Sequence, residues 1–412
     1  MNLHLQSTVV NRKSAIKISG SKSETNRLLL LKALYPNIIL ENASNSDDSE
    51  VMTAALSNLN YTQLNLINIH HAGTAMRFLT AFFAVQQNLE IVLTGSERMK
   101  ERPIKILVEA LNQLGAEITY SGIEGFPPLK IIGKKITKNQ ITLSANVSSQ
   151  YISALLLIAP KLENGLELTL EGEITSIPYI KMTLALLKEI GVETSFENNI
   201  IKINHLFSTP TLDVKGLIES DWSSASYFYS IIALSEIGTE ITLSTFKKNS
   251  LQGDAVLEEI YQNFGVSTTF NDNQSITISK IEIHKIQKIS LNLKNCPDIA
   301  QTIAVTCFGL EISCHLTGLH TLKIKETDRL EALKNELTKL SATIEITNES
   351  LTLTSSAKIN ENVTIKTYQD HRMAMSFAPL ALKTAINIEN AEVVSKSYPN
   401  FWEDLKTIGF KF

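Results

Sequence analysis

Cysteine is scarce in this chain and long apolar runs are absent, and each shortage excludes a class of protein. The three cysteines, Cys296, Cys307 and Cys314, fit neither a disulfide framework nor the spacing of a zinc site. This usage favours a reducing, cytoplasmic setting. No uncharged apolar run of about 18 residues predicts a membrane span, and the first residues lack the apolar segment and cleavage site of a signal peptide. We therefore expect a cytoplasmic protein without a metal or a membrane partner.

Charge of one sign and nucleotide-binding loops are missing as well. The chain has 38 Lys and Arg against 42 Asp and Glu, a net charge of -4, so no basic footprint predicts nucleic-acid binding. Neither a Gly-x-Gly-x-x-Gly pattern nor a Walker A loop occurs. A length of 412 residues suggests two or three domains with a sizeable core. Any anion sites therefore do not belong to an ordinary nucleotide enzyme.

The chain contains instead one pattern six times, a short polar stretch followed by about ten mostly apolar residues. Each copy predicts a helix that is buried along its body and polar only at its N-terminus. Because helix N-termini carry unpaired N–H groups and partial positive charge, six of them indicate a protein that holds anions. The helix-start markers are spaced by 51, 75, 75, 74 and 74 residues and are Ser23, Thr74, Ser149, Ser224, Asp298 and Arg372.

The second half of each repeat is predicted to be an amphipathic helix that ends at a left-handed C-cap, usually Gly, and leads into a strand. Agreement of two independent markers favours a repeat of roughly 70 residues, with three units in each of two domains. No Pro- or Ser-rich linker separates the halves, so we expect a tight crossing near 214–221. The predicted helix–strand segments are 107–118, 184–194, 256–268, 331–346 and 401–412, with a weaker copy at 51–62. The end markers lie 76, 74, 76 and 68 residues apart and are Gly115, Gly191, Gly265, Ser341 and Gly409.

Two segments of the N-terminal half carry groups that suit an anion. Lys22, Ser23 and Arg27 lie at one helix start, with Ser23 and Arg27 on the same face. Together they suit a phosphate or carboxylate, although a plain N-cap followed by a solvated charged turn is the alternative. Arg102 belongs to a charge run at 96–103 that most often would be a solvated face, but it follows a predicted strand.

Two segments of the C-terminal half are candidates too. Lys325 and Arg329, four residues apart, predict a cationic face on a helix start with Glu326 at its edge, or else an intrahelical ion-pair ladder. His371 and Arg372 head an apolar helix, where unpaired charge is costly and needs a partner.

Asp298 and Lys396 remain open from spacing alone. Asp298 follows a proline before an apolar helix, which first indicates a helix cap, but its carboxylate could also accept a proton from a hydroxyl. Lys396 has the sequence context of an ordinary surface lysine.

Together these motifs resemble one family closely, the 5-enolpyruvylshikimate-3-phosphate (EPSP) synthases, or 3-phosphoshikimate 1-carboxyvinyltransferases. The resemblance runs from Gly20 to about Phe401. The matching strings are 20–27, 72–77, 95–103, 147–150, 176–179, 223–226, 249–254, 297–298, 325–329 and 370–375.

The resemblance implies an α/β (α+β) protein with the enolpyruvyl transferase fold, an inside-out α/β barrel. Each of two similar domains would contain three βαββαβ-type repeats. The first domain would comprise 1–19 and 219–412 and the second 20–218, with crossings near 19–20 and 214–221. The active site would lie in the cleft between domains.

The resemblance also implies a reaction, transfer of the enolpyruvyl group of phosphoenolpyruvate to the 5-hydroxyl of shikimate 3-phosphate by addition and elimination, without a cofactor and by a monomer. Asp298, Glu326 and Lys22 would be catalytic. Shikimate 3-phosphate would contact Lys22, Ser23, Arg27, Ser148, Ser149, Gln150, Ser176, Tyr179, Asp298, Thr321 and Lys325. Phosphoenolpyruvate would contact Lys22, Gly73, Arg102, Gln150, Arg329, Arg372 and Lys396.

Several positions depart from the family pattern without removing a charge. His71, Thr321 and Gln369 stand where the family commonly has Asn, and Phe78 stands where it commonly has Pro. Because Gly73 is unchanged, the competitor glyphosate should still fit unless Phe78 shifts the loop. The alternatives are a UDP-N-acetylglucosamine enolpyruvyl transferase, which usually carries a Cys near the Arg102 region, and a non-catalytic anion-binding relative.

Overall fold

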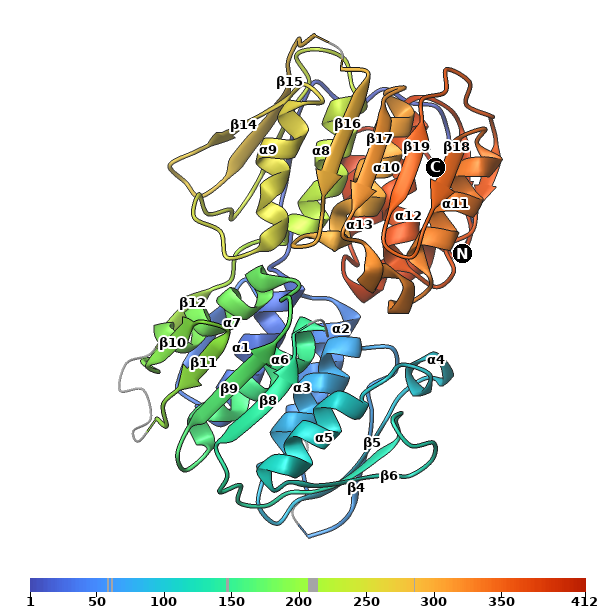
Figure 1. The fold of residues 1–412 in the computed structure, drawn as a ribbon. Coiled ribbons are helices and arrows are strands. Elements are labelled where there is room, and N and C mark those ends of the chain that lie inside the picture. Colours follow the sequence, from blue (N-terminus) through green and yellow to red (C-terminus); the bar gives the residue numbers. More distant parts are fainter. Residues whose placement is uncertain (58, 61, 146–147, 207–213, 285) are drawn as a thin grey trace. The chain divides into compact units, whose positions relative to one another are not determined.

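The computed structural model describes residues 1–57, 59–60, 62–145, 148–206, 214–284 and 286–412 (Figure 1). Two compact units make up this structure. Unit 1 consists of Met1–Gly20 and Glu219–Phe412, and unit 2 consists of Ser21–Ile218. Val147, which belongs to one of the matching strings, lies outside the described residues.

Unit 2 contains three sheets among its described residues, with strand orders β4-β5-β7-β6, β10-β11-β9-β8 and β12-β3. Strands such as β8 alternate exposed and buried residues, so one sheet face meets water and the other packs on helices. The helices are α1 (Lys22–Leu34), α2 (Asp47–Ser57), α3 (Gly73–Ala84), α4 (Glu97–Lys100), α5 (Lys105–Leu114), α6 (Ser149–Ile158) and α7 (Ile177–Glu189). The strands are β3 (Ile38–Glu41), β4 (Asn65–Asn68), β5 (Glu90–Thr94), β6 (Glu117–Tyr120), β7 (Leu129–Ile132), β8 (Gln140–Ser144), β9 (Leu166–Glu171), β10 (Thr194–Glu197), β11 (Ile200–Ile203) and β12 (Val214–Leu217).

Unit 1 is built in the same way, with strand orders β14-β15-β13-β2, β16-β17-β19-β18 and β1-β21-β20. Its helices are α8 (Trp222–Leu234), α9 (Leu257–Gln262), α10 (Ala300–Gly309), α11 (Arg329–Lys339), α12 (His371–Phe377) and α13 (Phe401–Thr407). The 3-10 turns η3 (Pro297–Ile299) and η4 (His320–Ile324) precede α10 and α11. The strands are β1 (Leu3–Leu5), β2 (Lys13–Ile16), β13 (Glu240–Leu243), β14 (Val266–Phe270), β15 (Ile276–Lys280), β16 (Lys288–Asn292), β17 (Ser313–Thr317), β18 (Thr343–Ile346), β19 (Leu351–Thr354), β20 (Val363–Ile365) and β21 (Ile386–Ile388).

The structure corrects the internal order of the repeat, which is βαβαββ rather than βαββαβ. In the copy from β16 to β19, β16 and β17 are parallel and α10 connects them, whereas α11 leads to the antiparallel strands β18 and β19. The copies from β4 to β7 and from β8 to β11 follow the same order. The physical reason is that a parallel pair needs a long crossover, here a helix, whereas a hairpin closes with a short turn.

The predicted buried helices are all present, as α1, α3, α6, α8, α10 and α12. Every residue of α10 and α12 is buried, and α3, α6 and α8 each leave only one residue less than fully covered. Their partners α5 and α11 bury only one face, as an amphipathic surface helix does. In α3, α6 and α8 the residue that is not fully buried lies in the first turn, so these helices reach the surface of the core at their polar N-termini.

The five predicted repeat ends adopt the left-handed backbone conformation that a C-cap requires. Four are glycines, with φ between 73° and 114°, and the fifth is Ser341 with φ 83°. A side chain in this conformation crowds the following carbonyl, so glycine is favoured at such a position. The repeat that was read from the sequence is thus confirmed in the backbone.

The returning chain at unit 1 is fixed by a small hydrogen-bonded network at Ser220. The Ser220 hydroxyl lies 2.7 Å from the carbonyl oxygen of Ile18 and 2.8 Å from that of Ser244. Ser220 also pairs with Gly20 in an antiparallel bridge, and the N–H of Asp221 donates to the carbonyl of Ser19. The two passages of the chain at the boundary of unit 1 are therefore held to each other by hydrogen bonds.

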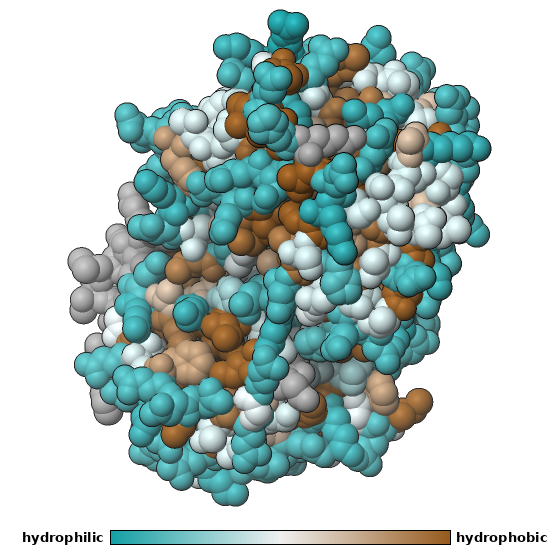
Figure 2. Space-filling model, turned by 45° about the horizontal axis from the view of Figure 1, so that its top comes forward, coloured by the Kyte–Doolittle hydropathy of each residue, from teal (hydrophilic) through white to brown (hydrophobic). Residues whose placement is uncertain are grey.

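Hydrophilic side chains dominate the face of the molecule drawn in Figure 2, with smaller apolar patches between them. In the described part of the chain, no helix is both long enough and apolar enough to cross a membrane.

We predict that Gly115→Ala lowers the free energy of unfolding by about 1 kcal/mol, because an alanine at φ 111° pays the left-handed penalty. No atom lies within 4 Å of the added Cβ, so crowding does not contribute. Urea denaturation followed by circular dichroism measures the change.

The matched control is Gly216→Ala, whose Cβ would meet its nearest atoms at an ordinary 3.7 Å and whose φ lies outside the left-handed region. We expect this variant to be unchanged or more stable by about 0.5 kcal/mol. Equal losses in both variants would contradict the backbone explanation.

Candidate functional site

Arg329 is the centre of the charged cluster in unit 1. It is the first residue of α11, and its side chain is only 2% exposed. Its guanidinium donates to Asp370 at 2.7 Å, to Asp298 at 2.9 Å and to Glu326 at 2.9 Å. Burial by itself lowers the pKa of Arg329, but the carboxylates of these three residues outweigh burial and raise the pKa above its ordinary value. The cation is therefore permanent, and it joins three separate segments of the chain.

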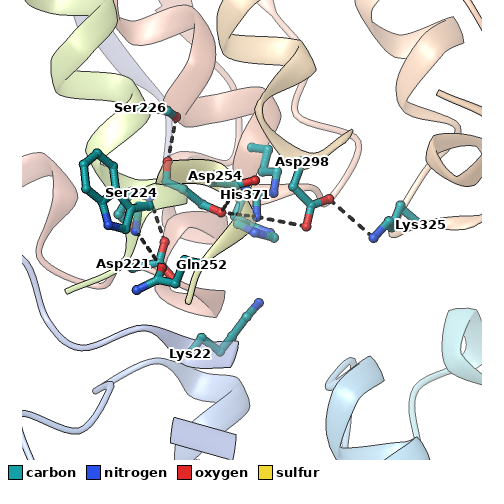
Figure 3. Close-up of polar contacts among 12 residues, drawn as sticks. Lys22, Asp221, Ser224, Ser226, Gln252, Asp254, Asp298, Lys325 and His371 are labelled. Carbon is teal, nitrogen blue, oxygen red and sulfur yellow. Dashed lines mark hydrogen bonds and ion pairs between the residues drawn. The ribbon is translucent and has the colours of Figure 1, made fainter. Parts of the chain in front are cut away.

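Asp298 is the second centre, and cations surround it. Besides Arg329, Lys325 Nζ and Arg372 Nη2 each lie 3.4 Å from its carboxylate oxygens; Figure 3 shows Lys325 and Asp298 pointing toward each other. Burial by itself raises the pKa of Asp298, but the charges of Lys325, Arg372 and Arg329 outweigh burial and bring the pKa far below its ordinary value. Asp298 makes no helix-capping hydrogen bond, so the capping interpretation is wrong and the charged role remains.

Lys396 is buried and paired, contrary to the surface-lysine interpretation. It is 4% exposed, and its Nζ lies 2.8 Å from a carboxylate oxygen of Glu326. The other oxygen of Glu326 accepts from Arg329. Glu326 thus bridges two cations, Lys396 and Arg329. A lysine exposed to solvent would not take part in such a buried bridge.

Lys325 and Arg329 do not share a helix face. The backbone of Lys325 is extended, and α11 begins only at Arg329, with Asp328 as its N-cap. The predicted i, i+4 arrangement on a helix is therefore wrong at this point. The two cations meet instead through Asp298, which both contact.

Asp254 is a buried acid. It belongs to the matching string 249–254, but the sequence alone predicts no role for it. Its carboxylate accepts a short hydrogen bond from the Ser223 hydroxyl, and Arg372 donates to the same hydroxyl at 3.2 Å. Burial, helped by the neighbouring charge of Asp298, raises the pKa of Asp254 to about 6. The signal available in the sequence was an acid at the end of the string 249–254, but burial is not visible there.

Arg27 in unit 2 is a buried cation whose hydrogen bonds go to hydroxyls and backbone carbonyls. It is 2% exposed and donates to Thr183 at 2.8 Å, to Ser153 at 3.0 Å and to the backbone carbonyl of its own helix turn. Its guanidinium lies 5.3 Å from the ring centroid of Phe78 and 5.8 Å from that of Tyr179. Burial lowers the pKa of Arg27 to about 10. Its hydrogen bonds thus use no carboxylate, although the charge of the nearby Glu24 partly offsets the effect of burial.

Arg102 is a second buried cation of unit 2, and in the described part of the chain its guanidinium has even fewer partners than that of Arg27. It is 9% exposed, and within the described residues its guanidinium has no hydrogen bond or ion pair. A Cβ added to Gly73, the first residue of α3, would lie 2.5 Å from Nη1 of Arg102. A buried cation against a helix N-terminus with no acid beside it is an incomplete arrangement that an anion would complete.

The remaining predicted residues of unit 2 lie at neighbouring helix starts. Lys22 begins α1 and forms an ion pair with Asp48 at 3.3 Å. Gln150 in α6 donates to Thr74 in α3 at 3.2 Å, and Arg27 links α1 to α6 and α7 through its two hydroxyl partners. The others also lie at or near these starts: Ser23 in α1, Ser148 and Ser149 at α6, and Ser176 and Tyr179 at α7.

Thr321 belongs to unit 1, in η4, and its hydroxyl oxygen is buried without a hydrogen-bond partner among the described residues. The predicted site residues therefore form one group in each unit, a cluster of paired charges in unit 1 and a set of helix starts with buried cations in unit 2. Within the described residues no group of His, Cys, Asp and Glu is arranged to hold a metal ion.

Comparison with known proteins gives one consistent result. A family model described as EPSP synthase (3-phosphoshikimate 1-carboxyvinyltransferase) matches residues 61–405. A 3-phosphoshikimate 1-carboxyvinyltransferase of Bacteroides fragilis strain YCH46 is 44% identical over 402 residues, which covers 97% of this chain and 96% of the relative. One from Shewanella pealeana is 34% identical over 420 residues, with 95% and 96% covered.

A solved EPSP synthase of Acinetobacter baumannii has a similar fold. The TM-score is 0.78, with 20% sequence identity, over 100% of this chain and 99% of that one.

We predict that Asp254→Asn and Asp298→Asn change stability in opposite directions with pH. The pKa of Asp254 is raised in the fold, so its contribution is present below pH 4 and is lost as pH rises through about 6. Asp254→Asn should therefore match the wild type near pH 4 and exceed it at pH 8 by roughly 3 kcal/mol.

Asp298 has a lowered pKa, so its contribution is present at neutral pH and is lost only in acid. Asp298→Asn should therefore cost about 3–5 kcal/mol at pH 7, because three cations lose a partner. Chemical denaturation of both variants and the wild type between pH 4 and pH 8 measures these differences. A loss of the same sign in both variants at pH 8 would refute the assignment.

Proposed function

The chain belongs to the EPSP synthase family, and on that premise we propose that it transfers the enolpyruvyl group of phosphoenolpyruvate to the 5-hydroxyl of shikimate 3-phosphate. The products are 5-enolpyruvylshikimate 3-phosphate and phosphate, in the route to chorismate and the aromatic amino acids. The structural observation that carries the proposal is the buried guanidinium of Arg102, which lacks a partner among the described residues and lies against Gly73. Both substrates bring a phosphate and a carboxylate, the groups that such a cation binds.

Phosphoenolpyruvate is assigned to cations in both units. Arg102 and the N-terminus of α3 at Gly73 supply an uncompensated positive site, and Arg329 and Arg372 supply permanent charges. Charged hydrogen bonds contribute about 1.5–3 kcal/mol each, more than a helix terminus by itself, so side chains carry most of the affinity. The remaining assigned contacts are Lys22, Gln150 and Lys396.

Shikimate 3-phosphate is assigned to the helix starts of unit 2 together with Asp298, Thr321 and Lys325 of unit 1. Arg27 supports this assignment, because its guanidinium makes hydrogen bonds to hydroxyls and lies beside two aromatic rings. The unsatisfied buried hydroxyl of Thr321 is a free hydrogen-bonding group of the kind that a sugar-like hydroxyl would pair with. The other assigned contacts are Lys22, Ser23, Ser148, Ser149, Gln150, Ser176 and Tyr179.

Asp298 is the proposed base for the 5-hydroxyl. Without ligands it is a weak base, because Lys325, Arg372 and Arg329 lower its pKa. Substrate phosphates and carboxylates that take hydrogen bonds from these cations would weaken their pull on Asp298, and its pKa would rise toward the value that proton transfer needs. Substrate binding would thereby switch on the base.

The chemistry then proceeds in two balanced steps. The hydroxyl oxygen bonds to C2 of phosphoenolpyruvate while its proton passes to Asp298, and the methylene carbon takes up a proton to become a methyl group. In the second step the methyl group returns a proton, the bond from C2 to the phosphate oxygen breaks with its electron pair, and the double bond reforms. Glu326 and Lys22 are the proposed groups for the proton moves at the methylene carbon.

The family match does not favour the UDP-N-acetylglucosamine enolpyruvyl transferase alternative. The chain also has no cysteine before Cys296. A non-catalytic relative is disfavoured because the charged cluster around Arg329 is intact. A cytoplasmic location and a monomeric state stay predictions, as does the fit of glyphosate at Gly73.

We predict that Asp298→Asn lowers kcat at least about 100-fold, because general base catalysis contributes on the order of 10²–10⁴. Phosphate release that requires both substrates measures turnover, and near-ultraviolet circular dichroism checks that the variant is folded. Calorimetry should still detect shikimate 3-phosphate. Undiminished turnover would remove Asp298 from the mechanism.

We also predict that Gly73→Ala raises the KM for phosphoenolpyruvate about tenfold or more, because the new Cβ must displace Arg102 and weaken a charged hydrogen bond. The KM for shikimate 3-phosphate should change little. Gly216→Ala, which adds the same methyl group without crowding, should leave both constants unchanged. An equal rise in both KM values for Gly73→Ala would indicate general disruption instead.

A further inference from the structure

The turn that leads into α12 is strained. Tyr368 and Gln369 are consecutive non-glycine residues with φ 52° and 56°, in the left-handed region. Such residues cost conformational energy and persist only where the surrounding structure fixes them. Asp370, which follows directly, is fully buried and accepts from Arg329. The strain therefore lies next to the centre of the charged cluster.

Glu336 holds this turn. It lies in α11, is fully buried, and one of its carboxylate oxygens accepts from the Tyr368 hydroxyl at 2.6 Å. The other oxygen accepts from the backbone N–H of Lys366 at 3.0 Å and from Lys339 Nζ at 2.6 Å. Both oxygens of this buried carboxylate thus accept hydrogen bonds from the segment before Asp370, and the charge of Lys339 balances the charge of Glu336.

The geometry of α11 makes this an attachment at two points. Glu336 is seven residues after Arg329, close to two helical turns, so both side chains project from the same side. Arg329 binds Asp370 at the end of the turn, and Glu336 binds Lys366 and Tyr368 at its beginning. Within the turn, the N–H of Asp370 donates to the carbonyl of Thr367 at 2.8 Å. One helix therefore fixes the conformation of residues 366–370.

We propose that Glu336, through Tyr368, is a positioning residue for the phosphoenolpyruvate-binding cations of unit 1. The turn sets where Asp370 lies, and Asp370 in turn orients the Arg329 guanidinium and caps α12 at the N–H of Arg372. A relaxed turn would move both arginines together. This inference rests on the proposed function, since it concerns how those two arginines meet a substrate.

A purely structural role for Glu336 predicts a different pattern. Loss of a fold-stabilising contact would lower stability and leave the kinetic constants of the folded enzyme unchanged. Loss of a positioning contact raises the KM for the substrate that the arginines bind while the KM for the other substrate stays constant. The ratio of the two KM changes separates these roles.

The main test variant is Tyr368→Phe, which deletes only the hydroxyl that Glu336 accepts from. We expect a rise of about five- to tenfold in the KM for phosphoenolpyruvate, less than the loss of a whole hydrogen bond to a charged group, because both arginines keep their other contacts. The KM for shikimate 3-phosphate should stay within about twofold of the wild type. Glu336→Gln, which cannot accept from both Tyr368 and Lys366, should show the same selective rise. Hydrogen–deuterium exchange should be faster in residues 366–373 of both variants.

The matched control is Tyr229→Phe, which removes a part-buried tyrosine hydroxyl that bonds Thr268 at 2.8 Å elsewhere in unit 1. It should lower the melting temperature similarly and leave both KM values and exchange in 366–373 unchanged. The proposal is overturned if Tyr368→Phe behaves like this control.

A binding measurement keeps the two claims apart. If the wild type transfers no enolpyruvyl group, the proposed function fails, and the positioning proposal is then decided by calorimetry, in which Tyr368→Phe should weaken binding of phosphoenolpyruvate and not that of shikimate 3-phosphate. If the wild type is active but exchange and KM do not respond to Tyr368→Phe, the positioning proposal fails and the function stands.

Discussion

The arrangement in unit 1 depends on a single buried cation, Arg329, which three carboxylates surround. Asp298, Glu326 and Asp370 come from a 3-10 turn, the bend before α11 and a helix cap, and none of them neighbours another in sequence. Burying a guanidinium is expensive unless its hydrogen bonds are satisfied, so the three segments cannot separate without exposing an unpaired charge. This constraint fixes the relative positions of the beginnings of α10, α11 and α12, and every other contact of the cluster follows from it.

The two units treat their cations in opposite ways. In unit 1 the arginines already have protein carboxylates, so the proposed anionic ligands would compete with Asp298 and Glu326 and would thereby raise the pKa of Asp298. In unit 2 Arg27 rests on hydroxyls and aromatic rings, and Arg102 has no partner among the described residues. An anion there adds a missing partner rather than replacing one. Affinity is therefore expected to arise mainly in unit 2, and control of proton transfer in unit 1.

Sequence reasoning succeeded where one residue or one local pattern sets the structure. The buried helices follow from apolar runs behind polar starts, and the left-handed ends follow from glycine, with Ser341 identified only by its place in the repeat. It failed where a side chain's meaning depends on distant partners. Lys396 was indistinguishable from a surface lysine, Asp298 from a helix cap, and Asp254 from any acid at the end of a loop. Burial and pairing are properties of the assembled chain, and no spacing rule reports them.

The amino-acid sequence by itself determined the repeat, the helix starts and the family, because apolar periodicity, capping residues and ordered motifs act over a few neighbouring positions. The tertiary structure alone decided which charges are partnered, which acid keeps its proton near pH 6, and that Glu336 and Arg329 hold one strained turn from the same helix. These outcomes require groups that are distant in sequence to share one buried environment, where Coulomb and desolvation energies both become large. Local sequence does not encode that proximity, and folding creates it.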